Sequence, residues 1–122
     1  MSKITPAEFT DYIKKVHEHL EWSPPPPDRL RFLALALCGE AGELANLVKK
    51  DWRGDDGQVV RQAKIAQELA DVAGYAFLIA AELGVDLLWE TYQKVQEAET
   101  RPAFLAFKNK GSHQPTGKAQ VF

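Results

Sequence analysis

The fold is decided by residues 30–51, LRFLALALCGEAGELANLVKKD. Leucines recur in this stretch at positions 30, 33, 37, 44 and 47, at the spacing of residues on one face of an α-helix. Asp28 can cap such a helix at its start, and Gly54 follows its expected end near Asp51. The pattern predicts an amphipathic helix over about 28–51.

Three further segments have helical spacing. Thr5-Pro6-Ala7-Glu8 reads as a capping box with proline at the first helical position, and predicts a helix to about Leu20. A helix is expected from Gln58 to Gly84, with its second half apolar on most sides, and a last helix is expected from Asp86 to about Thr100. Since no strand pattern stands out, we expect an all-α chain resembling a four-helix bundle.

Composition sets broad limits on the class of protein. A chain of 122 residues fits one domain, expected over residues 1–107, with a polar tail over 108–122 whose composition is typical of flexible segments. The formal charge of −2 gives no general attraction to nucleic acid or anionic membrane. Cys38, among apolar neighbours, is expected to be a buried thiol in a reducing compartment. With no apolar run typical of a signal peptide or membrane span, we expect a soluble, cytoplasmic protein.

Glu40 and Glu43 interrupt the leucine pattern. Glu40 lies where the stripe Leu33, Leu37, Leu44 calls for an apolar residue, and Glu43 follows one helical turn later. No lysine or arginine lies three or four residues from either glutamate. Two like charges at this spacing repel, and burial adds a desolvation cost.

The next helix repeats the arrangement with Glu68 and Asp71, and only Lys64 offers Glu68 a partner, in the less favourable orientation. If the two helices pack antiparallel, the two acidic motifs form one negative cluster that needs a cation. Mg²⁺ prefers oxygen ligands and is completed by waters and substrate phosphates. The sequence therefore predicts a Mg²⁺ site, which Mn²⁺ could also occupy, with these ligands: Glu40, Glu43, Glu68 and Asp71.

Two other readings of the acidic motifs stay open at this point: a solvated acidic face, and a di-iron carboxylate bundle. The di-iron bundle typically uses Glu-x-x-His pairs, and none occurs here. His17 and His19 are expected to be solvated. The glycines next to the acidic residues, Gly39, Gly42 and Gly74, are expected to permit close approach of the two helices.

These residues resemble the MazG-like, all-α nucleoside triphosphate pyrophosphohydrolase superfamily. The matching stretches run from Leu30 to about Arg101: LCGEAGEL at 37–44, Lys49-Lys50, ELADV at 68–72 with Tyr75, LGVD at 83–86, Lys94 and Arg101. The resemblance implies a four-helix bundle assembled as a dimer or tetramer. It also implies Mg²⁺-dependent hydrolysis of an NTP or dNTP to the monophosphate and pyrophosphate, as in house-cleaning of nucleotide pools.

The resemblance also suggests roles for individual residues. Glu40 or Glu43 is the candidate for orienting the attacking water. The candidates for binding the substrate phosphates are the basic residues of the matching stretches: Lys49, Lys50, Lys94 and Arg101. Trp22 and Trp52 flank the helix expected over about 28–51. They are candidates for stacking on the base, with a core or interface role as the alternative.

Two rival functions remain at this stage. One is hydrolysis of a related pyrophosphate substrate such as phosphoribosyl-ATP. The other is a non-catalytic helical module whose acidic stripe binds a basic partner. In each case we expect a homo-oligomer, because so short a chain leaves too little protein to cover the largely apolar third helix on all sides.

Overall fold

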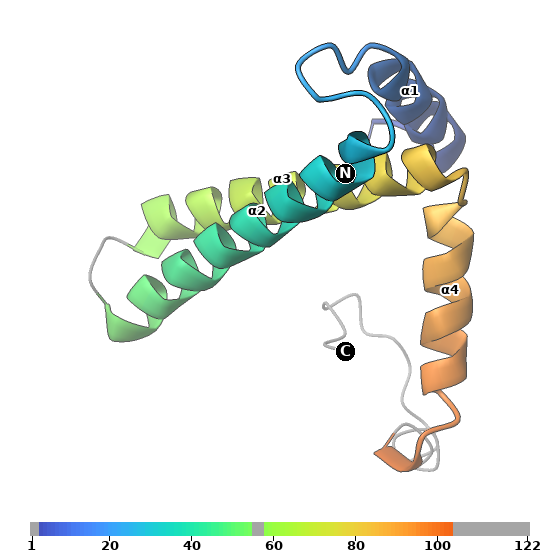
Figure 1. Ribbon diagram of the computed structural model, residues 1–122. Helices are drawn as coiled ribbons and strands as arrows, with labels where there is room; N and C mark the ends of the chain where they lie inside the picture. The colour runs from blue at the N-terminus through green and yellow to red at the C-terminus, as the bar shows by residue number, and fades with distance from the viewer. Residues whose placement is uncertain (1–2, 55–57, 104–122) are drawn as a thin grey trace. The chain divides into compact units, whose positions relative to one another are not determined.

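The structure is a computed structural model that describes residues 3–54 and 58–103, without the side chains of 58–60. Within these ranges the chain forms four α-helices and no strand, which confirms the all-α prediction (Figure 1). The helices are α1 (Pro6–Glu18), α2 (Asp28–Arg53), α3 (Gln58–Leu83) and α4 (Leu87–Ala98). The predicted tail, 108–122, and residues 55–57 of the α2–α3 connection lie outside the described residues.

The helix ends follow local chemistry. The Thr5 hydroxyl accepts a hydrogen bond from the Glu8 amide at 3.2 Å, and the Glu8 carboxylate accepts one from the Thr5 amide at 2.8 Å. These bonds confirm the predicted capping box and lower the pKa of Glu8, since they favour its charged form. Gly54 and Gly84 adopt the left-handed conformation, with φ of 74° and 68°, and end α2 and α3 as predicted.

The predicted cap at Asp28 is wrong. Asp28 is the first residue of α2, and the cap position belongs to Pro27, which makes no side-chain capping bond. The Asp28 amide already donates to the Pro25 carbonyl, so the chain turns into the helix before it reaches Asp28. The Asp28 carboxylate instead pairs with Arg31 at 2.9 Å.

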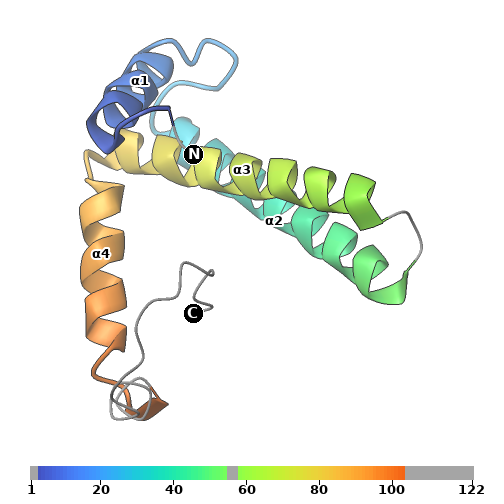
Figure 2. The same ribbon diagram turned by 180° about the vertical axis from the view of Figure 1, so that it is seen from behind.

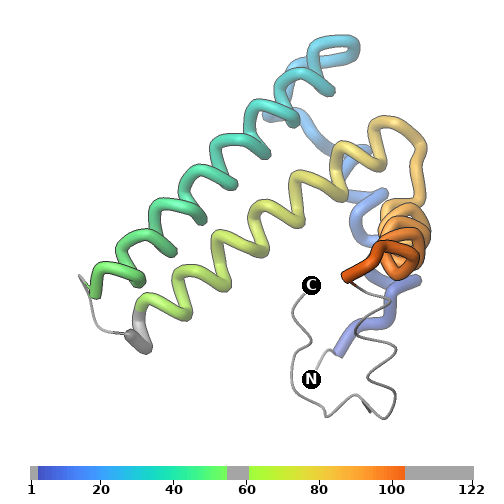
Figure 3. The backbone as a smooth tube through the Cα atoms, turned by 90° about the horizontal axis from the view of Figure 1, so that it is seen from below, coloured from blue at the N-terminus to red at the C-terminus, as the bar shows by residue number. Residues whose placement is uncertain are grey.

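Helices α2 and α3 form an antiparallel hairpin, and α1 packs against α3 (Figures 2 and 3). The core lies at the end of the hairpin where α2 begins and α3 ends, around Leu20, Leu33 and Leu78. An edge-to-face contact between Phe9 and Phe77, with ring centroids 4.8 Å apart, adds to the α1–α3 interface. Burial of these side chains holds the three helices together at this end.

Arg61 joins the two helices at the other end of the hairpin. Its side chain is only 4% exposed, and its Nη1 donates to the Asp51 carboxylate at 2.9 Å and to the Asp51 carbonyl at 3.0 Å. The positive charge thus sits beside the last turn of α2, where the helix dipole favours a cation. This contact fixes the end of α2 against the start of α3.

His17 is not solvated as predicted. Its Nε2 lies 2.6 Å from the Glu82 carboxylate, and the Arg29 guanidinium lies 3.8 Å from the same group. Arg29 also donates to the Ser23 hydroxyl at 3.1 Å. The network links α1, α2 and α3 at the edge of the core.

Cys38 is exposed, which corrects the expectation of a buried thiol. It follows the α3-facing residue Leu37 by one position, and successive residues lie about 100° apart around a helix. The apolar neighbours that suggested burial therefore do not place Cys38 toward α3.

The chain divides into two compact units, residues 1–86 and 87–122. The first contains the hairpin and α1. The second contains α4, which has no buried residue. No single described helix has both the length and the hydropathy that crossing a membrane requires.

Leu33 and Leu35 provide a test of the core. Leu33 is 0% exposed and Leu35 is 74% exposed, although they lie two residues apart on α2. We expect Leu33→Ala to lower the free energy of unfolding by about 2–5 kcal/mol, because it leaves a cavity in the core. Leu35→Ala should change it by less than about 0.5 kcal/mol. Urea unfolding followed by far-UV circular dichroism measures both, and equal losses would contradict this assignment of the core.

Candidate metal centre

Three carboxylates converge in the middle of the hairpin. One oxygen each from Glu40 on α2 and from Glu68 and Asp71 on α3 lie within 4.8 Å of one another. Glu40 and Glu68 are half-buried, and Asp71 is exposed. The convergence follows from the antiparallel packing, because both glutamates occupy inward positions of their helices, where the pattern otherwise places leucine, isoleucine or valine.

The buried oxygens of this cluster lack partners. Oε2 of Glu40 and Oε2 of Glu68 are both shielded from solvent and accept no hydrogen bond. Within the described ranges no lysine, arginine or histidine forms an ion pair with the cluster, and Lys64 does not pair with Glu68. A buried carboxylate without a donor or counter-charge is costly, so the cluster calls for a positive ligand.

The charges of the cluster act strongly on Glu40. A hydrogen bond with Glu68, desolvation, and the negative charges of Glu43 and Asp71 raise the pKa of Glu40 to about 7. The hydrogen bond between the two glutamates requires a proton on one of them, so it forms only in the protonated state. When both carboxylates are ionised, their buried oxygens have no donor. A proton and a cation therefore compete for the same place.

The donor set fits a hard divalent cation. All three ligand groups offer oxygen, and no histidine or cysteine belongs to the cluster. Around Mg²⁺, ligand oxygens lie about 2.9 Å apart when they are neighbours and about 4.2 Å apart when they are opposite, and the three oxygens of the cluster all lie within 4.8 Å of one another. Glu43, the fourth predicted ligand, is exposed and lies outside the group of three, but its charge contributes to the raised pKa of Glu40.

The predicted glycine contacts are absent. A Cβ atom added at Gly39, Gly42 or Gly74 would meet no other atom within 4 Å. These glycines therefore do not serve close packing of α2 against α3, and the expectation to that effect is wrong. Gly39 and Gly42 are exposed, and Gly74 is half-buried.

The two lysines of α2 lie away from the carboxylates. Lys49 is exposed and Lys50 is half-buried. They follow Glu40 by nine and ten residues, a distance of about 14–15 Å along the helix axis. A ligand that touched both the cluster and these lysines would have to lie along α2.

The tryptophans lie near opposite ends of α2. Trp22 is 55% exposed and contacts Phe32 edge to face, with ring centroids 5.9 Å apart. Trp52 is 89% exposed, so nearly its whole ring is available to a ligand or a partner.

Lys94 and Arg101 belong to the second unit and line one groove on it. Lys94 pairs with Glu97 at 3.2 Å, which partly neutralises its charge. The remaining residues of the groove are apolar or polar, with one carboxylate: Leu87, Glu90, Thr91, Val95 and Ala98.

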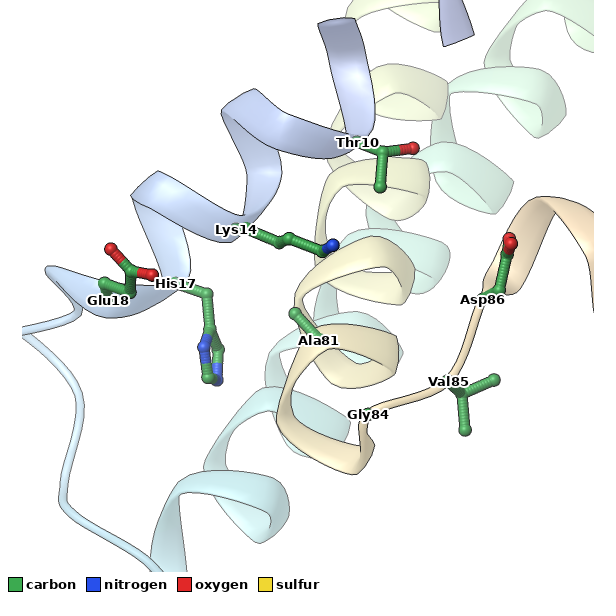
Figure 4. Close-up of a pocket in the computed structure, with 8 residues that line it drawn as sticks. All are labelled: Thr10, Lys14, His17, Glu18, Ala81, Gly84, Val85 and Asp86. Carbon is green, nitrogen blue, oxygen red and sulfur yellow. The ribbon is translucent and has the colours of Figure 1, made fainter. Parts of the chain in front are cut away.

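A cleft that sequence patterns did not indicate lies between α1 and the end of α3 (Figure 4). The cleft is lined by two basic side chains, Lys14 and His17, and by two acidic side chains, Glu18 and Asp86. On α1 these residues lie three and four positions apart, so helical spacing alone could have grouped them. Their pairing with α3 depends on tertiary packing.

Comparison with known proteins identifies a phage relative of the chain. The chain is 33% identical over 90 residues to the Gene 37 protein of Mycobacterium phage L5, covering 72% of this chain and 74% of the phage protein. It belongs to the family of this phage protein. No family model and no solved structure matches the chain. The name Gene 37 protein states no activity.

The raised pKa of Glu40 predicts a pH dependence of stability in this Gene 37 relative. Without divalent metal, the native state holds a proton that the unfolded chain releases between the ordinary value of 4.5 and about 7. Stability should therefore be highest below this window and fall as pH rises through it. Urea unfolding midpoints at about pH 5 and pH 8 in EDTA should differ less in Glu40→Gln than in wild type. A control, Glu21→Gln at an exposed glutamate, should keep the full difference.

Metal binding should raise the melting temperature. Mg²⁺ or Mn²⁺ at a hundred times its Kd stabilises the native state by about 2.7 kcal/mol if it does not bind the unfolded chain. We expect Asp71→Asn or Glu68→Gln to lose most of this gain, while stability without metal holds or rises because a repelling charge is gone. Asp28→Asn, at an exposed aspartate that pairs with Arg31, should keep the gain. An unchanged wild-type melting curve with metal and nucleotide present would refute the metal site.

Proposed function

We propose that the chain is a Mg²⁺-dependent nucleoside triphosphate pyrophosphohydrolase, which hydrolyses an NTP or dNTP to the monophosphate and pyrophosphate. The observation that carries the proposal is the cluster of Glu40, Glu68 and Asp71, whose oxygens converge from two helices without a basic partner among the described residues. The resemblance of the motifs around these residues to MazG-like enzymes supports the same reaction.

The cluster suits a reaction at phosphate because it is negative and open on one side. Mg²⁺ held by Glu40, Glu68 and Asp71 would supply neutralisation of phosphate charge and polarisation of the phosphoryl group. Asp71 is exposed, so the cluster faces solvent from which a substrate can approach. A binding site of this kind attracts a nucleotide only together with its cation, because the carboxylates alone repel phosphate.

Glu43 is the stronger candidate for activating water. It lies one helical turn from Glu40, is exposed, and is the one predicted acidic residue outside the group of three. An exposed carboxylate beside the cluster can accept a proton from the attacking water while the other three hold the cation. Glu40 is less suited to activating water, because its Oε2 is shielded from solvent.

The basic and aromatic candidates complete the proposal. Lys49 and Lys50 on α2 would bind the β- and γ-phosphates. In the second unit, Lys94 and Arg101 are proposed as phosphate-binding residues, with the planar guanidinium of Arg101 suited to bidentate contacts. Trp22 and Trp52 expose enough ring surface to stack on a base. We propose removal of unwanted nucleotides from the pool as the cellular role.

The products and the site of attack test the reaction. Incubation with Mg²⁺ and a panel of common and damaged nucleotides should give monophosphate and pyrophosphate rather than diphosphate and orthophosphate. In ¹⁸O-labelled water, attack at the α-phosphorus places the label in the monophosphate. Label found only in pyrophosphate or orthophosphate would contradict the proposed attack. Absence of pyrophosphate release with every nucleotide, including phosphoribosyl-ATP, would favour the non-catalytic module.

Variant kinetics test the assigned roles. Glu43→Gln should lower kcat by about 10²–10⁴-fold, the usual contribution of a general base, with little change in KM. Lys94→Ala or Arg101→Ala should raise KM as well, because phosphate contacts are lost. Glu21→Gln, which removes an exposed carboxylate on the loop before α2, should leave both constants unchanged. A Glu43→Gln enzyme with wild-type kcat would remove Glu43 from the mechanism.

A further inference from the structure

A stripe of residues runs along α2, each one position before a residue that faces α3. The inward positions are buried or half-buried: Leu33, Leu37, Glu40, Leu44, Leu47 and Asp51. The residues that precede them share one face of α2, because they keep the same three- and four-residue spacing. We call these residues the flank stripe: Phe32, Ala36, Gly39, Glu43, Asn46 and Lys50.

The chemistry of the flank stripe changes in order along α2. At its start, Phe32 is 36% exposed and meets Trp22 edge to face, with ring centroids 5.9 Å apart. A Cβ atom added at Gly39 would meet open space, Glu43 lies beside the carboxylate cluster, and Lys50 comes last. The order is therefore aromatic, open, acidic and basic. The parts of a nucleoside triphosphate follow the same order: base, sugar, α-phosphate and departing pyrophosphate.

The flank stripe lies on a side of the hairpin that α1 covers at one end. In an antiparallel pair of helices, the residues that precede inward positions lie on the same side of both helices. On α3 these residues include Leu78, which is buried where α1 packs, and Asp71, which is exposed (Figure 1). On α2, Glu43 and Asn46 are exposed. A ligand can therefore lie along α2 from the end of α1 past the cluster.

The spacing along α2 separates the two tryptophans as partners of a base. Phe32, which contacts Trp22, precedes Glu40 by eight residues, about 12 Å along the helix axis. Lys50 follows Glu40 by ten residues, about 15 Å in the other direction. Trp52 lies about 18 Å from Glu40, beyond Lys50 and outside the flank stripe. The aromatic pair and the lysine thus stand on opposite sides of the cluster.

We infer that the triphosphate substrate lies along the flank stripe of α2, with its base stacked on Trp22 and its pyrophosphate directed toward Lys50. The inference rests on the proposed function and adds the direction of the substrate and the choice of Trp22 over Trp52. Phe32 is a positioning residue, because its edge-to-face contact holds the indole ring. The ring of Trp22 is 55% exposed, so surface remains for a base.

Two probes separate the base end from the phosphate end. Isothermal titration of the full chain with Mg²⁺ uses the four α,β-imido deoxynucleoside triphosphates, which resist hydrolysis, and inorganic tripolyphosphate, which has no base. Trp22→Leu should weaken binding of the preferred nucleotide about 5- to 100-fold, the usual loss when a stacked aromatic is removed, and leave tripolyphosphate binding unchanged. Lys50→Met should weaken binding of both probes. Equal losses for both probes in Trp22→Leu would overturn the inference.

Phe32 is tested through the same two probes. Phe32→Ala should weaken nucleotide binding about 2- to 10-fold without affecting tripolyphosphate, and Phe32→Tyr should restore it because the ring edge returns. Leu35→Ala, at an exposed residue of α2 outside the flank stripe, should bind both probes like wild type. Far-UV circular dichroism and the Mg²⁺-induced shift in melting temperature should be retained in every variant, which excludes a folding defect.

Fluorescence gives a measurement that does not depend on affinity. The chain has three tryptophans, so Trp52→Phe with Trp89→Phe leaves Trp22 as the only indole. Its emission should change with the nucleotide and stay constant with tripolyphosphate. Pyrophosphate release with wild-type nucleotide binding in Trp22→Leu and Phe32→Ala would overturn the inference and leave the proposed reaction standing. A wild type that binds neither probe would overturn both, and a loss in Trp52→Leu without one in Trp22→Leu would overturn the choice of Trp22.

Discussion

The antiparallel packing of α2 against α3 is the constraint on which the rest of the structure depends. It brings Glu40 beside Glu68 and Asp71, which belong to another helix and a distant part of the sequence. The same packing creates a cost, because carboxylates replace apolar side chains at inward positions and their buried oxygens lack donors. The hairpin therefore contains a destabilising segment at its centre, where the hydrogen bond with Glu68, desolvation and the nearby negative charges together raise the pKa of Glu40.

The two ends of the hairpin compensate for its centre. At one end Leu20, Leu33 and Leu78 form the core, and at the other Arg61 binds the last turn of α2 through Asp51. Because both ends are fixed, the carboxylates cannot move apart by separation of the helices. Because the fold holds the carboxylates close together, they need not be ordered when a cation binds. The cation therefore gains more binding free energy from this preorganised cluster than it would from mobile side chains.

Much of this arrangement could be predicted from the sequence, because it depends on spacing and local chemistry. The 3.6-residue period located the helices, Gly54 and Gly84 marked their ends, and the unpaired glutamates indicated convergence. Contacts that depend on tertiary packing could not be predicted in this way. No local pattern links His17 to Glu82 or Arg61 to Asp51, and the exposure of Cys38 depends on which stripe of α2 faces α3.

The phase of α2 relates the metal site to the core. Leu33 and Leu37 lie on the same stripe of the helix as Glu40 and Leu44. A single residue inserted into α2 between Leu37 and Glu40 would rotate the preceding part of the helix by about 100° relative to the rest. The leucines of the core and the carboxylates of the cluster could then no longer both face α3. The spacing of Leu33, Leu37, Glu40 and Leu44 thus sets the core and the proposed cation site together.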